Sequence, residues 1–98
     1  MLVKIIKTYR NVVAICDSEL LGKKFEEDDF QLDVKESFFG GDEVNEEKAS
    51  EIIKRMIIED ATFNIVGDES IKTAMNAGLI SEDNIKKIQG VPFAMVLI

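Results

Sequence analysis

The segment from Phe63 to Ile71 constrains the chain most, because a short apolar run stops at a glycine and passes directly into a helix-start signal. Phe63–Val66 predicts a short buried strand, and Gly67 ends it. Asp68 and Glu69 then stand where the first turn of a helix begins. The same order of strand, glycine and helix occurs in phosphate-binding loops and in ordinary capped helices. The choice between the two therefore bears on function.

A phosphate-binding loop needs several glycines, so that backbone N–H groups can converge on the anion, and usually a lysine or a hydroxyl at the helix start. This segment has one glycine, and Asp68 and Glu69 occupy the place that an anion would take. A carboxylate at that place satisfies the free N–H groups and repels phosphate. We therefore expect a helix that Asp68 caps itself, and the segment gives little support to nucleotide binding.

The remaining pattern predicts an α+β fold with a small mixed or antiparallel sheet. The chain opens with two strand-like runs, Leu2–Thr8 and Val12–Asp17, whose short polar connection is typical of an N-terminal β-hairpin. Two main helices are expected at about residues 46–59 and 69–77, and the run Phe93–Ile98 predicts a C-terminal strand. Because that run is almost wholly apolar, we expect it to lie inside the sheet or to pair with another chain.

The first of the two helices has the clearest signal. Asn45 is a preferred N-cap residue, and Glu46 and Glu47 follow in the first turn, where the helix dipole favours anions. Gly78 stands where the second helix should end, since glycine is the usual residue just past a helix C-terminus. Apolar residues of the first helix recur at the spacing of one helical face: Ala49, Ile52, Ile53, Met56 and Ile57.

Local composition predicts the secondary structure of the shorter segments. The acidic stretch within Phe25–Asp29 predicts a solvated loop, and the alternation of apolar and polar residues over Phe30–Lys35 predicts a half-buried strand. Phe38–Gly41 is expected to be a tight connection with an aromatic anchor. Ile85–Ile88 could continue the helical turn that opens at Ser81 or could already be a strand; we prefer the strand, and the sequence leaves the state of residues 85–89 open. Gly90–Pro92 is assigned to a turn that leads into the C-terminal strand.

Length and composition limit the class of protein to which the chain can belong. A chain of 98 residues makes one domain, residues 1–98, and 46% hydrophobic residues suffice for a packed core. The N-terminal apolar run is interrupted by Lys4 and Lys7, so it resembles neither a signal peptide nor a membrane span. Cys16 is the one cysteine, and we expect a packed, inert thiol beside Asp17. These features predict a soluble cytoplasmic protein that does not contact membranes.

The chain contains no histidine, which excludes Ser-His and Cys-His nucleophile activation and most zinc or iron sites. The acidic run Glu26–Asp29 lacks the ligand spacing and the central glycine of a calcium loop. A second cluster of acidic residues, within Asp42–Glu47, spans the predicted start of a helix, where the helix dipole already favours acidic side chains. We expect no catalytic residue, no metal and no cofactor. A carboxylate- or metal-dependent enzyme remains as an alternative that rests on the acidic groups alone.

The net charge of −7 is unevenly distributed, because Asp17 to Glu51 holds thirteen acidic and four basic residues, whereas residues 1–16 hold three basic residues and no acidic one. Nucleic-acid affinity depends largely on neutralising phosphates, so the overall charge argues against tight non-specific binding but leaves room for a small basic surface. The alternative is a solvated hairpin edge protected by lysines. The candidate nucleic-acid-binding residues could hold phosphate or stack on bases: Lys4, Lys7, Arg10, Lys23 and Lys24, with Tyr9 and Phe25.

Several short motifs occur in order along the chain: Ile15–Lys23, Phe39–Gly41, Asn64–Gly67, Gly78–Ile80 and Ile88–Ala94. Together they resemble the archaeal domain-of-unknown-function family 424. The resemblance runs from end to end and implies an archaeal, cytoplasmic α+β domain with no established activity, described at most as predicted RNA-binding. In that family a histidine often follows the proline of the last motif, where this chain has Phe93, so a role of that imidazole does not transfer.

The residues and the resemblance together favour a non-enzymatic binding module that is associated with RNA, the ribosome or the translation machinery. The expected partner is then RNA or a ribonucleoprotein. An alternative is a protein-interaction or self-associating domain that uses the C-terminal strand Phe93–Ile98. The sequence indicates neither the physiological ligand nor the oligomeric state.

Overall fold

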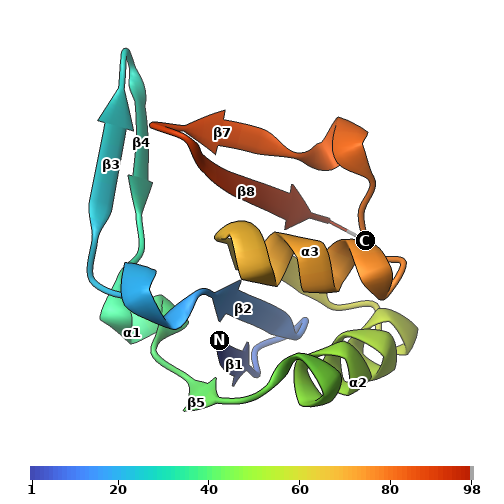
Figure 1. The fold of residues 1–98 in the computed structure, drawn as a ribbon. Coiled ribbons are helices and arrows are strands. Elements are labelled where there is room, and N and C mark those ends of the chain that lie inside the picture. Colours follow the sequence, from blue (N-terminus) through green and yellow to red (C-terminus); the bar gives the residue numbers. More distant parts are fainter. Residues whose placement is uncertain (98) are drawn as a thin grey trace.

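The computed structural model describes residues 1–97, which form a six-stranded sheet, a separate two-stranded hairpin and three α-helices (Figure 1). The sheet order is β5-β1-β2-β6-β8-β7, and its one parallel pair is β2 with β6. The predicted α+β fold with a mixed sheet is confirmed. The elements are β1 (Leu2–Ile6), β2 (Val12–Cys16), β3 (Lys24–Glu27), β4 (Phe30–Asp33), α1 (Glu36–Phe39), β5 (Asp42–Glu43), α2 (Glu46–Ile58), β6 (Thr62–Val66), α3 (Asp68–Asn76), β7 (Lys86–Ile88) and β8 (Val91–Val96), with single 3₁₀ turns at Ser18–Leu20 and Glu82–Asn84.

Helices α2 and α3 cover one face of the sheet and enclose the main core (Figure 1). Because side chains alternate along a strand, every second residue of β2 and β6 points toward these helices. Phe63 is fully buried and belongs to this cluster. The helices contribute the predicted apolar face of α2 and a smaller one from α3: Ala49, Ile52, Ile53, Met56, Ile71 and Ala74.

The opposite face of the sheet is covered only in part, by α1 and by the β3–β4 arm, which we define as Lys24–Asp33 (Figure 1). A second, smaller core forms there around Phe39 of α1, which packs with Ala14, Cys16, Val34 and Val66. Phe38 and Phe39 meet edge to face with ring centroids 5.0 Å apart. Both belong to α1, so only Gly40 and Gly41 of the predicted connection Phe38–Gly41 lie outside a helix. The rest of this face stays open.

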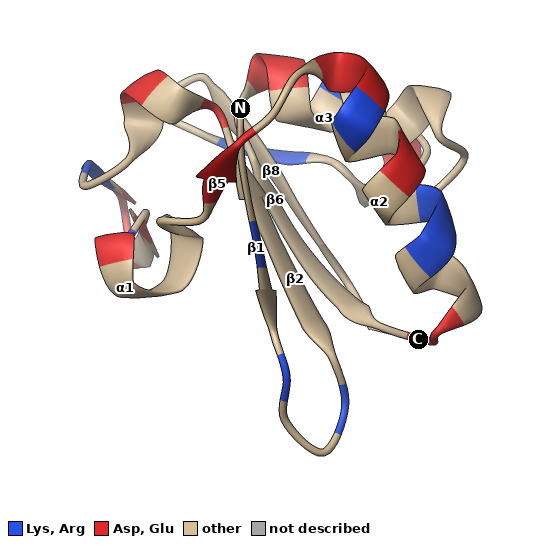
Figure 2. Cartoon of the chain, turned by 90° about the horizontal axis from the view of Figure 1, so that it is seen from below, with Lys and Arg blue, Asp and Glu red and all other residues tan. Residues whose placement is uncertain are grey.

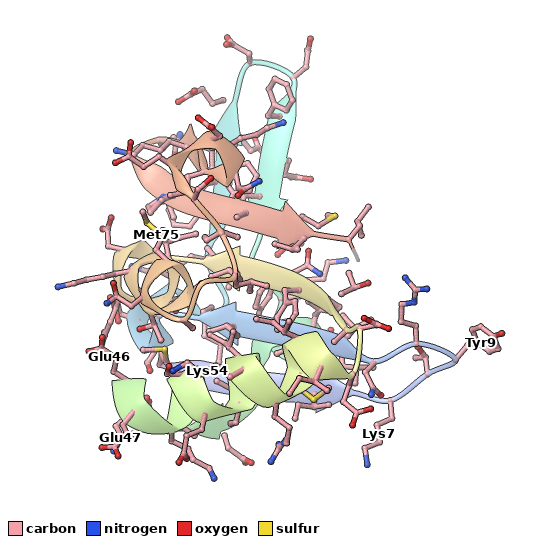
Figure 3. All side chains as sticks on the ribbon, turned by 90° about the vertical axis from the view of Figure 1, so that its right-hand side faces the viewer. Lys7, Tyr9, Glu46, Glu47, Lys54 and Met75 are labelled. Carbon is pink, nitrogen blue, oxygen red and sulfur yellow. The ribbon has the colours of Figure 1, made fainter. Side chains whose placement is uncertain are left out.

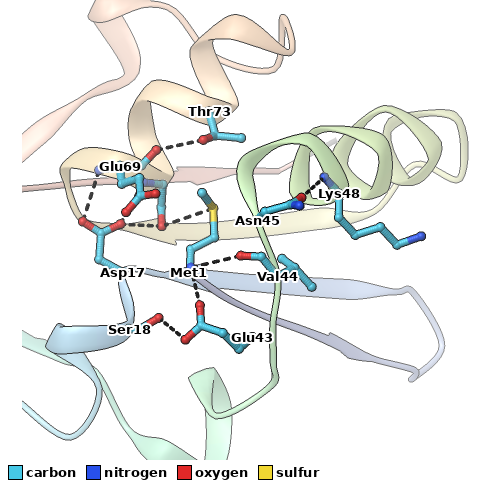
Figure 4. A network of polar contacts seen from close by, with 10 residues as sticks. Met1, Asp17, Ser18, Glu43, Val44, Asn45, Lys48, Glu69 and Thr73 are labelled. Carbon is cyan, nitrogen blue, oxygen red and sulfur yellow. Dashed lines mark hydrogen bonds and ion pairs between the residues drawn. The ribbon is translucent and has the colours of Figure 1, made fainter.

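The helix ends follow the local sequence, with one exception. The side chain of Asn45 accepts a hydrogen bond from the Lys48 N–H at 2.8 Å and caps α2 as predicted (Figure 4). At the end of α3, Gly78 has a φ of 82°, its N–H donates to Met75 and the Leu79 N–H donates to Ala74. These two hydrogen bonds form a Schellman motif, so the prediction that the helix ends at Gly78 is confirmed.

The predicted cap of α3 is wrong. The N-cap residue is Gly67, whose φ is 110°, and Asp68 is already helical. The carboxylate that satisfies the helix start belongs to Asp17 at the end of β2, which accepts hydrogen bonds from the N–H groups of Glu69 and Ser70 (Figure 4). Because β2 and β6 are parallel neighbours, their ends meet at the same edge of the sheet, and Asp17 reaches the helix across it.

The structure also corrects the segment Phe25–Asp29, predicted as a loop. Phe25 to Glu27 belong to β3, and only Asp28 and Asp29 form the turn into β4. Phe25 lies opposite Leu32 in the register, and both pack against the second core. The arm is also tied to the β7–β8 turn, because Gln89 donates to the carbonyl of Glu26 and to the carboxylate of Glu27. Non-local pairing thus outweighs the low strand propensity of the acids.

Strand β8 begins at Val91, two residues earlier than the predicted start, and the predicted end at Ile98 lies outside the described residues. It pairs with β6 on one side and β7 on the other, so the expectation that it lies inside the sheet is confirmed. On the β7 side only Val91–Phe93 are paired, so among residues 1–97 the edge of Ala94–Val96 on that side has no partner strand. Within residues 1–97, no helix has the length and apolarity to cross a membrane.

Candidate nucleic-acid interface

The β1–β2 hairpin projects from the body of the molecule, and its tip is the connection of residues 7–11 (Figure 2). Strands β1 and β2 pair over five positions from Leu2–Cys16 to Ile6–Val12, so the tip is supported by a regular ladder. In Figure 2 the projecting hairpin carries basic residues and no acidic ones, whereas acidic residues lie on β5, α1 and the helix starts. The predicted charge separation is therefore visible at this end of the molecule.

Tyr9 is the most exposed large side chain at the tip. Its relative exposure is 108%, and Figure 3 shows its ring pointing away from the protein at the end of the hairpin. The hydroxyl of Thr8 donates a hydrogen bond to the carbonyl of Arg10, which closes the backbone around Tyr9. Such a side-chain-to-backbone bond orders a short turn. The tip thus presents an aromatic ring from an ordered backbone, with Lys7 and Arg10 on either side in the sequence.

The tip also approaches the end of α2. Lys7 and Arg55 line one hollow of about 350 Å³, together with Asn11 and Glu59. The Thr62 N–H donates to the Asn11 carbonyl at 2.9 Å, which fixes this part of the hairpin beside the start of β6. Arg55 was not predicted from the sequence, because no local signal links a residue in the last turn of α2 to the hairpin. The nearby carboxylate of Glu59 partly offsets the two cations.

The structure divides the other predicted basic residues between two places. Lys4 lies on β1, and its ammonium group donates to the carbonyl of Ser37 in α1 at 2.8 Å. Lys23 and Lys24 are exposed at the start of the β3–β4 arm, where the acidic run follows directly. Phe25 is half-buried against the second core. Lys7, Tyr9 and Arg10 thus lie together in the tip segment, whereas the Lys4 side chain turns to α1 on the opposite face of the sheet from the Lys7 hollow, and Lys23 and Lys24 lie on the arm.

The site at the start of α3 is already filled by the protein itself. Asp17 is 4% exposed, and each of its carboxylate oxygens accepts from this helix: Oδ2 from the Glu69 N–H at 3.1 Å and Oδ1 from the Ser70 N–H at 2.8 Å. A Cβ on Gly67 would lie 2.3 Å from the Asp17 carboxylate carbon. The glycine thus serves the close approach of an internal carboxylate, in the place where a phosphate loop would hold its ligand.

Cys16 and Glu43 are both held by their surroundings within the protein. The thiol of Cys16 is fully buried, and burial, assisted by the negative charge of Asp17, raises its pKa to about 11. Glu43 accepts hydrogen bonds from the Met1 amine and from Ser18, which together lower the pKa of its carboxyl (Figure 4). Across residues 1–97, no three His, Cys, Asp or Glu side chains gather closely enough to hold a metal ion.

Comparisons with known proteins identify a family and a solved structure. The profile of the family described as "Protein of unknown function (DUF424)" matches residues 6–98. The chain is also similar to a protein whose structure is described as "Crystal structure of an uncharacterized conserved protein from Methanopyrus kandleri". The two chains share 28% identity with a TM-score of 0.87, over 97% of this chain and 88% of that one. No curated protein matches the chain.

Proposed function

This chain belongs to the family described as "Protein of unknown function (DUF424)", and we propose from its surface that it is a non-enzymatic module that binds single-stranded RNA through the β1–β2 hairpin. The observation that carries the proposal is the fully exposed Tyr9 at the hairpin tip, between Lys7 and Arg10. Aromatic rings on which bases stack, flanked by cations that hold the backbone, are the general means of binding single strands. The proposed setting is a cytoplasmic ribonucleoprotein such as the translation machinery.

The geometry favours an unpaired strand over a duplex. One exposed ring on a narrow projection can stack with a base that is free of its partner, whereas a duplex hides its base faces. The adjacent hollow is lined by Lys7 and Arg55 and so adds Arg55 to the cations of the tip. We assign Lys7, Arg55 and Arg10, the last next to Tyr9 in the sequence, to phosphate contacts. Lys4 is partly engaged by Ser37 and is assigned a weaker role.

The charge of the whole chain sets the expected strength of binding. With −7 overall, the acidic remainder repels RNA, and the affinity rests on a few local contacts. For single strands the logarithm of affinity falls with the logarithm of salt concentration by about 0.7 per phosphate contact. Three contacts predict a slope of about −2, so that raising salt from about 50 to 200 mM weakens binding by roughly fifteenfold.

The test is fluorescence anisotropy of a labelled single-stranded RNA of mixed sequence at low salt. Lys7→Glu and Tyr9→Ala should each weaken binding by about tenfold, as the loss of one phosphate contact or one stacked base predicts. Lys24→Glu is the matched charge control on the arm, and it should leave the affinity within about twofold because the arm lies apart from the tip. Equal losses for Lys7→Glu and Lys24→Glu would show that only net charge matters, and the proposal would fail.

A further inference from the structure

Strand β1 forms an edge of the sheet for most of its length. Its outer neighbour β5 pairs only with Leu2 and Val3, so Lys4–Ile6 have a partner strand on the β2 side alone. Figure 2 looks at the molecule from this side and shows β5 beside the start of β1, with no further strand along the rest of it. Among residues 1–97, this stretch of β1 is therefore open to pairing with an added strand.

The outward backbone groups of this open stretch belong to Ile5. On the β5 side the carbonyl of Met1 accepts a hydrogen bond from the Val44 N–H, and the N–H and C=O groups of every second residue of a strand point to the same side. Those of Val3 and Ile5 therefore face outward too. Val3 is covered by β5, whereas within the described part of the chain the N–H and C=O of Ile5 have no partner. An extended peptide can satisfy both groups by adding one strand to the sheet.

A hollow of about 470 Å³ lies beside Ile5, between β1 and the start of α2. Because side chains alternate along a strand, Val3 and Ile5 point to the α2 side of the sheet and Lys4 points to the other side. Ile52 of α2 and Val44 add apolar surface to the hollow next to Ile5. A peptide residue that lies opposite Ile5 directs its side chain into this hollow, and an aliphatic side chain suits the surface that it meets.

The Lys7 hollow continues the same groove, because Ile5 lines both hollows. Lys7 follows Ile5 by two residues and so projects on the same side of the strand, near the end of α2 (Figure 3). Of the residues that line this second hollow, Lys7 and Arg55 are cationic and Glu59 is the one carboxylate. A peptide side chain two positions away from the aliphatic one reaches this place, where a carboxylate pairs with the two cations.

From these contacts we infer that the groove between β1 and α2 binds an extended acidic segment of a partner protein, paired antiparallel with β1. The segment has an acidic residue, any one residue and then an aliphatic residue. Strand β5 already pairs antiparallel with this edge, and a segment that continues its line keeps that direction. A second copy of the chain is the poorer occupant, because a two-fold contact would set Lys7 and Arg55 against their own counterparts. The inference goes beyond the proposed RNA binding and does not depend on it, although both use these two cations.

Nuclear magnetic resonance titration of the isotope-labelled full chain with the peptide acetyl-Thr-Thr-Glu-Thr-Val-Thr-amide tests the inference. The peptide should shift the backbone signal of Ile5 and slow the hydrogen exchange of its N–H. Lysine in place of the glutamate should weaken binding by about tenfold through the lost ion pairs.

Backbone methylation of the same peptide tests strand pairing directly. N-methyl groups on Glu and Val, whose N–H groups would face β1, should weaken binding by at least about tenfold. N-methyl groups on the Thr residue after each of them are the matched control, and they should leave the affinity within about threefold because those N–H groups face away from β1. Equal losses for the two methylated peptides would show that no edge is paired and would overturn the inference.

Variants of the protein separate the groove from the hairpin tip. Arg55→Glu should reverse the charge preference, so that the lysine peptide binds better than the glutamate peptide, and Lys24→Glu on the arm is the control that leaves the preference unchanged. Tyr9→Ala should keep the peptide affinity within about twofold while it weakens RNA binding. Peptide binding without any RNA binding would leave this inference standing and contradict the proposed function.

The other occupants of the groove give distinct results. If the peptide does not bind and single-stranded RNA shifts the Ile5 signal instead, the groove belongs to the RNA surface and the inference fails. A dimer in light scattering, with the Ile5 N–H already protected from exchange in the free protein, would assign the edge to a second copy and would also overturn it.

Discussion

The carboxylate of Asp17 accepts hydrogen bonds from both the backbone N–H and the hydroxyl of Ser70, at 2.8 and 2.7 Å. Ser70 is fully buried, so this pair joins the end of β2 to the first turn of α3 inside the protein (Figure 4). The contact fills the junction of β6, Gly67 and α3, where a phosphate could otherwise have been held. The RNA binding that we propose would therefore use another surface, and we assign it to the exposed hairpin tip.

Removal of this internal cap should destabilise the protein. Asp17→Ala leaves the N–H groups of Glu69 and Ser70 without their acceptor, and we expect the free energy of unfolding to fall by about 2–3 kcal/mol. Asp17→Asn keeps one acceptor oxygen and should cost about half as much. Urea denaturation followed by circular dichroism measures both. Asp29→Ala, on the exposed arm turn, is the control. A loss below about 0.5 kcal/mol for Asp17→Ala would contradict this role.

Gly67→Ala should be destabilising for two separate reasons. Its φ of 110° is unfavourable for alanine, and the new Cβ would lie 2.3–2.7 Å from the Asp17 carboxylate atoms. We expect a loss of roughly 2–4 kcal/mol from strain and overpacking together. The double variant Asp17→Ala/Gly67→Ala should lose less than the sum of the single losses by about 1 kcal/mol, because the clash is gone. Strict additivity in denaturation experiments would show that the contact is not as close as described.

The Cys16 thiol should be unreactive in the folded protein. Burial and then the charge of Asp17 raise its pKa from the ordinary value of 9.0 to about 11, so the thiolate is scarce at neutral pH. Below about pH 9 the raised pKa contributes its full stability, which is lost as the pH rises toward 11 and the unfolded chain releases this proton first. Ellman's reagent should react only on unfolding. Cys16→Ala should lack this part of the alkaline loss, and rapid labelling of the folded protein at pH 7 would refute the assignment.

Asn64→Val should make the protein more stable. The asparagine occupies a central strand without a partner for its amide among residues 1–97, and valine suits both the strand and its apolar neighbours. We expect a gain of about 1 kcal/mol, visible as a rise in Tm of about 4–8 °C in a thermal melt. A gain of this size would indicate that folding does not explain the asparagine. A clear loss of stability would instead assign it a structural role.

The sequence predicts those elements whose signals are local. Helix α2 follows from Asn45 and the apolar spacing behind it, and the end of α3 follows from Gly78, because cap and helix are close in sequence. The β1–β2 hairpin is likewise local. By contrast, β3 is a strand only because β4 and Gln89 hold it, and its own acids predict a loop.

Long-range contacts explain what sequence patterns miss at the candidate sites. The cap of α3 comes from Asp17, 52 to 53 residues earlier, while the adjacent Asp68 imitates a cap in the sequence. Arg55 joins Lys7 only because α2 ends beside the hairpin. Asn64 is conspicuous in the sequence itself, because strand formation does not explain a lone asparagine within the mainly apolar strand Thr62–Val66. The side chains around Asn64 come from the arm and α1, and their positions beside it follow only from the three-dimensional fold.

The most direct test of hairpin binding uses the fluorescence of Tyr9. The chain has one tyrosine and no tryptophan, so its intrinsic emission reports the hairpin tip alone. On titration with single-stranded RNA at low salt, stacking of a base on the ring should quench this emission, and raising the salt should restore it with a slope of about −2. Lys7→Glu should shift the quenching to about tenfold higher RNA concentration. Tyr9 emission that stays unchanged while a labelled RNA binds the protein would contradict the account.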